Sequence, residues 1–153
     1  MALLSLFAKK ALLSEEEQTL IVEAIRASEQ KTSGEIRVYV ERHCKFVDPL
    51  DRAVQVFQTL KMEATEYRNA VLVYIAVKDR QLAIFADEGI YKKAGTAFWN
   101  DAVATMLRHF NKNDYGKGIA TVVNEIGNAL QQHFPYDGQT DKNELPDDIV
   151  FGR

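Results

Sequence analysis

The chain has 153 residues, the size of one domain, and 46% of them are hydrophobic, enough for a single core without metals or disulfides. Its 19 basic and 22 acidic residues give a net charge of −3, and this near-balance argues against nucleic acid as the main partner. No apolar run approaches the roughly 20 residues of a membrane-spanning helix. The single cysteine, Cys44, excludes an intrachain disulfide. We therefore expect a cytoplasmic protein that acts as a monomer.

The first predicted helix begins at a capping box formed by Ser14 and Glu17, in which each side chain can bond the backbone amide of the other residue. Apolar residues recur behind it at helical spacing, and we expect the helix to end near residues 32–34, with Gly34 as its C-terminal stop. Polar and apolar residues then alternate over residues 35–42, which predicts a strand with one better-buried face.

A second helix is predicted to start at Asp48-Pro49, since proline is favoured in a first turn. Its apolar stripe consists of Leu50, Ala53, Val54, Phe57 and Leu60. Residues 70–77 are continuously apolar, which is typical of a central strand covered on both faces. A short polar turn leads to another apolar run, residues 82–86, which predicts a strand near 81–87 that forms an antiparallel hairpin with the strand before it. The helix between the first two strands predicts a parallel right-handed crossover.

Two further helical patterns follow, over residues 98–110 and 119–130, and Pro135 ends the second. Together the elements predict an α/β fold, a three-layer α/β/α sandwich around a small mixed sheet. We expect one domain over residues 1–136, followed by an acidic tail at 137–153. That tail holds five acidic side chains against two basic ones, a net charge of −3.

The usual catalytic signatures are absent from the sequence. It contains no phosphate-binding or dinucleotide-binding glycine motif, no H-E-x-x-H motif, no paired cysteines and no G-x-S-x-G motif. His43 and Cys44 are neighbours at a strand end and point in opposite directions, so they make a poor catalytic dyad. The sequence therefore offers no complete catalytic motif.

One edge of the predicted sheet collects carboxylates. Because the third strand runs against the first two, its C-terminal residues Asp87 and Glu88 reach the edge where Glu35 begins the first strand. Such oxygen ligands suit a divalent cation, and Ca²⁺ is favoured over Mg²⁺ because it tolerates irregular geometry. The sequence thus predicts a low-affinity metal site at Asp87, Glu88 and Glu35. The alternative is a surface salt bridge between Arg68 and either Asp87 or Glu35.

The order and spacing of several short segments resemble the TPM domain family, which includes photosystem-repair proteins of thylakoids and many bacterial proteins. The resemblance covers about residues 12–134, and the ending at residues 143–149 is similar to that of short, stand-alone bacterial members. Its landmarks are the segments Leu12–Glu17, Thr32–Ile36, Asn69–Val73, Asp79-Arg80, Asp87–Ile90 and Phe110–Gly118.

The resemblance implies an α/β/α sandwich, calcium binding at an acidic crevice in some members and weak acid-phosphatase activity in some plant members. Three functions follow as hypotheses. The first is a cation-binding accessory protein related to stress or repair. The second is a weak metal-assisted phosphatase in which Arg68, Lys92 or Lys93 holds the phosphate. The third is a module that binds a protein partner through the tail at 137–153.

Overall fold

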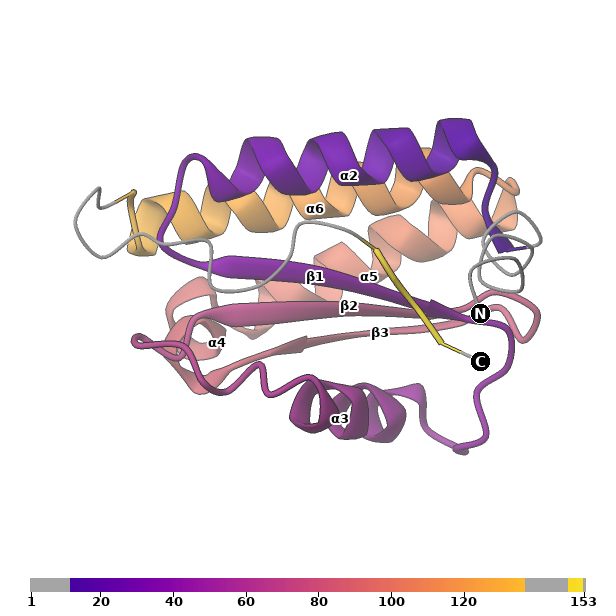
Figure 1. Cartoon of the computed structure of the whole chain (residues 1–153), viewed down its shortest axis with the longest axis horizontal. Helices are drawn as coiled ribbons and strands as arrows, with labels where there is room; N and C mark the ends of the chain where they lie inside the picture. Colours follow the sequence, from indigo (N-terminus) through magenta and orange to yellow (C-terminus); the bar gives the residue numbers. More distant parts are fainter. Residues whose placement is uncertain (1–11, 137–148, 153) are drawn as a thin grey trace, which may run out of the picture.

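A computed structural model of the chain describes residues 12–136 and 149–152 (Figure 1). The elements in it are α2 (Glu15–Glu29), β1 (Glu35–Glu41), α3 (Pro49–Thr59), β2 (Ala70–Ala76), β3 (Gln81–Ala86), α4 (Glu88–Ala94), α5 (Thr96–Asn111), α6 (Tyr115–His133) and β4 (Val150–Phe151). The strands form one mixed sheet in the order β3-β2-β1-β4. Helices α2, α5 and α6 lie over one face of the sheet and α3 lies over the other, which confirms the predicted three-layer sandwich.

The three central strands follow the predicted topology. β1 and β2 are parallel, with Glu35 opposite Ala70, and β2 and β3 form the predicted antiparallel hairpin. All of β2 is buried, as its continuous apolar sequence predicts for a strand covered on both faces. The two faces carry separate apolar cores, a large one beneath α2, α5 and α6 and a smaller one beneath α3.

The predicted start of α2 is confirmed and its predicted end is wrong. Ser14 and Glu17 form the capping box, with both side-chain-to-backbone hydrogen bonds present. The helix ends at Glu29 rather than at Gly34. Gly34 instead lies at the entry to β1, where a Cβ atom would come within 2.7 Å of a methyl carbon of Leu130. Close packing against α6 therefore explains this glycine.

Helix α3 begins as predicted, with Asp48 as its N-cap and Pro49 in its first turn. Its buried residues are Ala53, Val56 and Phe57, so Val56 takes the place that the sequence analysis gave to Val54. Leu50 is 42% exposed and lies beside a groove described below.

Two elements were not predicted, the short helix α4 and the two-residue strand β4. β4 pairs in parallel with Tyr39 and Val40 of β1, so the last residues of the predicted acidic tail belong to the sheet. The rest of that tail, residues 137–148, lies outside the described residues. Among the helices that the structure describes, none is long and apolar enough to cross a membrane.

Candidate ligand-binding site

The antiparallel course of β3 brings Asp87 to the edge where β1 and β2 begin. Asp87 donates its backbone N–H to the carbonyl of Ala70 at 2.9 Å, and Ala70 stands opposite Glu35 in the β1–β2 register. Glu35, Ala70 and Asp87 therefore form one row across the sheet. The row places Glu35 two strand spacings, roughly 10 Å, from Asp87 along the backbone.

The Asp87 carboxylate is held by Arg68 in a two-pronged ion pair. Arg68 Nε lies 2.7 Å from Oδ2 and Nη2 lies 2.9 Å from Oδ1, while Nη1 lies 3.3 Å from an oxygen of Glu88. The Asp87 side chain is only 4% exposed, against 44% for Arg68 and 71% for Glu88. The hydrogen bonds that Arg68 donates to Asp87 raise the pKa of the Arg68 guanidinium, so this residue is the fixed positive charge of the site.

The backbone around this ion pair is tightly constrained. Arg68 has a positive φ of 53°, a left-handed conformation that residues other than glycine rarely adopt. Its carbonyl accepts the N–H of Gly89 at 2.8 Å, and a Cβ atom at Gly89 would lie 2.5 Å from the same oxygen. Asp87 also caps α4 by accepting the N–H of Glu88 at 2.8 Å. The glycine thus lets α4 start against the loop that carries Arg68.

The predicted ligands Asp87, Glu88 and Glu35 are not arranged around a common point as the ligands of a metal ion would be. Within residues 12–136 and 149–152, no group of three or more His, Cys, Asp or Glu side chains could hold a metal ion. Asp87 and Glu88 are adjacent, but Arg68 contacts both carboxylates. The salt bridge considered as the alternative is therefore present, and the calcium site stays a prediction.

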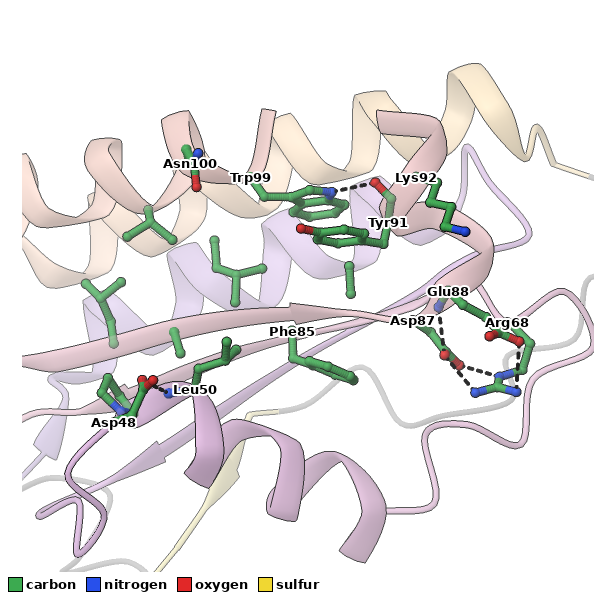
Figure 2. Close-up of a pocket in the computed structure, with 16 residues that line it drawn as sticks. Asp48, Leu50, Arg68, Phe85, Asp87, Glu88, Tyr91, Lys92, Trp99 and Asn100 are labelled. Carbon is green, nitrogen blue, oxygen red and sulfur yellow. Dashed lines mark hydrogen bonds and ion pairs between the residues drawn. The ribbon is translucent and has the colours of Figure 1, made fainter. Parts of the chain in front are cut away.

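A groove of about 680 Å³ runs from this ion pair along β3 (Figure 2). β3 is an edge strand, and residues 82–86 line the groove. Leu50 lies on the α3 side, and Tyr91, Trp99 and Val103 lie on the side of α4 and α5. The indole N–H of Trp99 donates to the Tyr91 carbonyl at 3.0 Å and the two rings stack, which fixes this aromatic wall.

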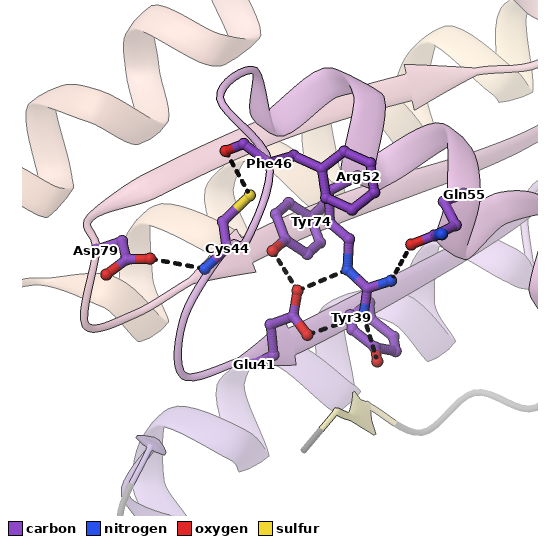
Figure 3. A network of polar contacts seen from close by, with 8 residues as sticks. All are labelled: Tyr39, Glu41, Cys44, Phe46, Arg52, Gln55, Tyr74 and Asp79. Carbon is purple, nitrogen blue, oxygen red and sulfur yellow. Dashed lines mark hydrogen bonds and ion pairs between the residues drawn. The ribbon is translucent and has the colours of Figure 1, made fainter.

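A buried ionic cluster that the sequence analysis missed lies at the other end of strand β1, where that strand finishes (Figure 3). The Glu41 carboxylate at the end of β1 accepts two hydrogen bonds from Arg52 of α3, at 2.8 and 2.9 Å, and one from the hydroxyl of Tyr74. Burial, followed by the hydrogen bond to Glu41, raises the pKa of Tyr74 above its ordinary value. The hydrogen bond to Glu41 also raises the pKa of Arg52. All of the charge in this cluster is paired internally, so we interpret it as structural.

His43 and Cys44 both bind Asp79 and do not act on each other. His43 Nδ1 lies 2.9 Å from one Asp79 oxygen, and the Cys44 backbone N–H donates to the other at 2.7 Å. These two contacts lower the pKa of Asp79. The Cys44 thiol lies 3.5 Å from the carbonyl of Phe46, and the His43 ring contacts Asp79 rather than this thiol, in line with the poor dyad that was predicted.

Comparisons with known proteins agree with this architecture. The family model for the TPM domain matches residues 7–129. The solution structure of the BA42 protein from the psychrophilic bacterium Bizionia argentinensis is 38% identical to this chain, with a TM-score of 0.82 over 92% of this chain and 95% of that one. The N-terminal domain of the cg2496 protein from Corynebacterium glutamicum is 20% identical, with a TM-score of 0.58 over 78% of this chain and 75% of that one, and shows the fold alone. No curated protein matches the chain.

The family match covers most of the described fold, from the capping box of α2 through nearly all of α6. It also contains every residue of the Arg68–Asp87–Glu88 ion pair and of the β3 groove. The chain belongs to the TPM domain family.

Proposed function

We propose that this TPM domain is a binding domain that takes a divalent cation, Ca²⁺ in preference to Mg²⁺, at the Asp87–Glu88 end of the groove. The observation that carries the proposal is the unequal exposure of the ion pair. Asp87 is a nearly buried carboxylate, whereas its positive partner, Arg68, extends from a half-exposed position. In this arrangement a cation arriving from solvent displaces the half-exposed guanidinium and takes its place beside Asp87.

In this proposal Arg68 is an internal counterion that competes with the metal. Asp87 and Glu88 supply carboxylate oxygens, and Glu35 adds negative charge from the same row of the sheet. With few protein ligands, water completes the shell and the dissociation constant is on the order of 10⁻⁴ M. Calcium is favoured because its coordination number and geometry are flexible.

The test is an NMR titration of the amide signals with CaCl₂. Loss of the competing charge in Arg68→Gln is expected to tighten binding about tenfold, since like charges a few ångströms apart cost one to a few kcal/mol. The matched control is Arg26→Gln on the exposed side of α2, which changes the net charge equally and leaves the groove intact. The double variant Asp87→Asn/Glu88→Gln is expected to abolish the calcium-dependent shifts.

Two results would contradict the proposal. One is an equal gain in affinity from Arg26→Gln, which would make the effect one of net charge. The other is survival of the same calcium-dependent shifts in the double variant, which would place the ion elsewhere. Mg²⁺ is titrated in parallel, and weaker shifts than with Ca²⁺ are expected.

The weak phosphatase implied by the resemblance is tested on the same sample with a phosphate ester. Arg68, offered as a phosphate ligand, is engaged by two carboxylates, and the Lys93 ammonium lies 4.5 Å from the ring centre of Phe134. No described contact therefore favours this alternative over cation binding. Partner binding through the tail is tested by deleting residues 137–148, which lie outside the described residues.

A further inference from the structure

The open edge of β3 presents backbone hydrogen-bonding groups to the groove. The Asp87 N–H donates to the Ala70 carbonyl, so these two residues are a hydrogen-bonded pair. From this pair along β3, hydrogen-bonded and non-hydrogen-bonded pairs alternate. The backbone N–H and C=O groups of Phe85 and Ala83 therefore also point toward β2. The N–H and C=O groups of Leu82, Ile84 and Ala86 therefore point away from β2, and no other described strand pairs with β3.

These outward groups lie in a recess rather than on a free surface. Leu82, Ile84 and Ala86 are each at most 9% exposed, and all three line the groove. A row of unpaired backbone groups on an edge strand is a template for pairing with another chain. The described residues supply no partner for them, so the floor of the groove has the hydrogen-bonding pattern of a strand that is ready for a neighbour.

We propose that the groove along β3 takes an extended polypeptide segment of a partner protein, which pairs with β3 as an additional strand. This proposal does not depend on calcium. From Leu82 to Ala86 the outward groups span about 14 Å, the length of roughly five extended residues. Backbone hydrogen bonds provide the affinity in this mode of recognition, and pockets for alternate side chains provide the specificity.

The walls of the groove decide against a second copy of this chain as the occupant. α3 lies on one side of β3, and α4 and α5 lie on the other, with Leu50 and Trp99 projecting beside the strand (Figure 2). A second copy would bring its own helices α3, α4 and α5 against these walls. A single extended segment without flanking helices fits between the walls.

Charge and side-chain character define the segment further. At the Asp87 end of the groove the positive charges of Arg68 and Lys92 balance the carboxylates of Asp87 and Glu88, whereas at the hairpin end the charged lining residue is Asp48. For antiparallel pairing, the segment therefore ends with a basic residue, beside Asp48. Its alternate residues, paired with 86, 84 and 82, face the same side of the sheet as those residues, toward the Trp99 and Val103 wall. Apolar β-branched side chains suit these positions.

The probe is the acetylated and amidated peptide Thr-Val-Thr-Val-Thr-Val-Lys, titrated to millimolar concentration against the full chain. Its central valine is set opposite Ile84. The readout is hydrogen exchange of the backbone amides. We expect the amides of Leu82, Ile84 and Ala86 to exchange quickly in the free protein and to slow at least tenfold when the peptide is bound. The amides of Ala83 and Phe85 face β2 and are expected to be protected throughout.

Matched peptides separate strand pairing from general apolar contact. N-methylation of the central valine removes an N–H that faces β3 and is expected to abolish the protection. N-methylation of the following threonine removes an N–H that faces away from β3 and is expected to preserve it. In the protein, Ala86→Pro removes one outward donor at an edge where proline is tolerated, and Ala86→Ser retains it.

Three results would overturn the proposal. The first is no protection of the three amides at millimolar peptide. The second is equal binding of the two N-methylated peptides. This comparison uses the unsubstituted protein, so it remains valid even if Ala86→Pro fails to fold. The third is protection of the same amides in the free protein that is lost on dilution, because this would identify a second copy as the occupant.

Discussion

At the scale of single residues, the strongest constraint lies at the end of β1, where Glu41 is buried with its partners. Tyr74 is fully buried and donates its hydroxyl to a Glu41 oxygen. Burial first and this hydrogen bond second raise the pKa of Tyr74 above its ordinary value of 10.0. An acid with a raised pKa in the folded state contributes stability below its unfolded pKa and loses it as the pH rises further. The native state therefore weakens above pH 10.

We predict that Tyr74→Phe reduces stability at neutral pH and flattens its dependence on alkaline pH. The substitution leaves a buried Glu41 oxygen with one partner fewer, which costs about 1–3 kcal/mol. Urea unfolding at neutral pH and again above pH 10 measures both effects. The control is Tyr136→Phe, at a position that is 56% exposed, which should change neither quantity. A pH dependence as steep as that of the unsubstituted protein would mean that Tyr74 does not carry the effect.

Residue-level prediction from sequence succeeded where neighbours along the chain determine the contact. The capping box of Ser14 and Glu17 follows from their spacing alone. The Arg68–Asp87 ion pair appeared only as an alternative, because the predicted antiparallel course of β3 brings several charged residues to one place without showing which of them make contact. The Glu41–Arg52 pair was missed altogether, since nothing in the alternating pattern of β1 shows that α3 will carry an arginine beneath it. A glutamate at the end of a strand, followed by an arginine on the next helix, is the signal that was available.

At the scale of elements, α2 and α6 approach each other closely through small residues. A Cβ atom at Gly127 would lie 2.3 Å from the Ser28 hydroxyl oxygen and 2.5 Å from its Cβ atom. Ser28 in turn donates its hydroxyl to the carbonyl of Val123. The glycine therefore sets the distance between the two helices.

We predict that Gly127→Ala destabilises the fold by about 1–3 kcal/mol despite the higher helix propensity of alanine, since overpacking forces the helices apart. The measurement is the free energy of unfolding. The double variant Ser28→Gly/Gly127→Ala gives the methyl group space and should be more stable than the sum of the two single changes implies. Additive single effects would show that the two residues are not in conflict.

Sequence patterns identified the long elements and missed the short ones. β2 was predicted to within one residue because a continuous apolar run has few other interpretations. α4 was missed because Asp87, Glu88 and Gly89 together read as a turn, whereas Asp87 actually caps a helix. β4 was missed because two residues carry no periodicity, and its place is determined only by contact with β1. Local sequence patterns do not predict elements that are held in place by tertiary contacts alone.

At the scale of the whole molecule, the sheet is completed by residues from the far end of the chain. Ile149 is 5% exposed and packs into the larger core, directly before β4. The N–H of Gly152 donates to the carbonyl of Val40 at 2.8 Å. These contacts fasten the last described residues to β1.

We predict that Ile149→Ala costs about 2–4 kcal/mol, as expected for a large residue in a packed core. The chemical-denaturation midpoint, measured with an unchanged m-value, reports the loss. The control is Val47→Ala, at a side chain that is 100% exposed, which should shift the midpoint little. If the two variants behave alike, β4 does not contribute to global stability.

The late position of β4 has a consequence for the order in which the protein folds during synthesis. Its partner β1 is made early, whereas β4 follows every other described element. At 5–20 residues per second, the intervening chain takes on the order of ten seconds to emerge. Throughout that interval Tyr39 and Val40 lack the strand that pairs with them in the folded protein. A nascent chain thus exposes an unpaired strand edge next to its ribosome, where other chains can join it and where a chaperone has time to act.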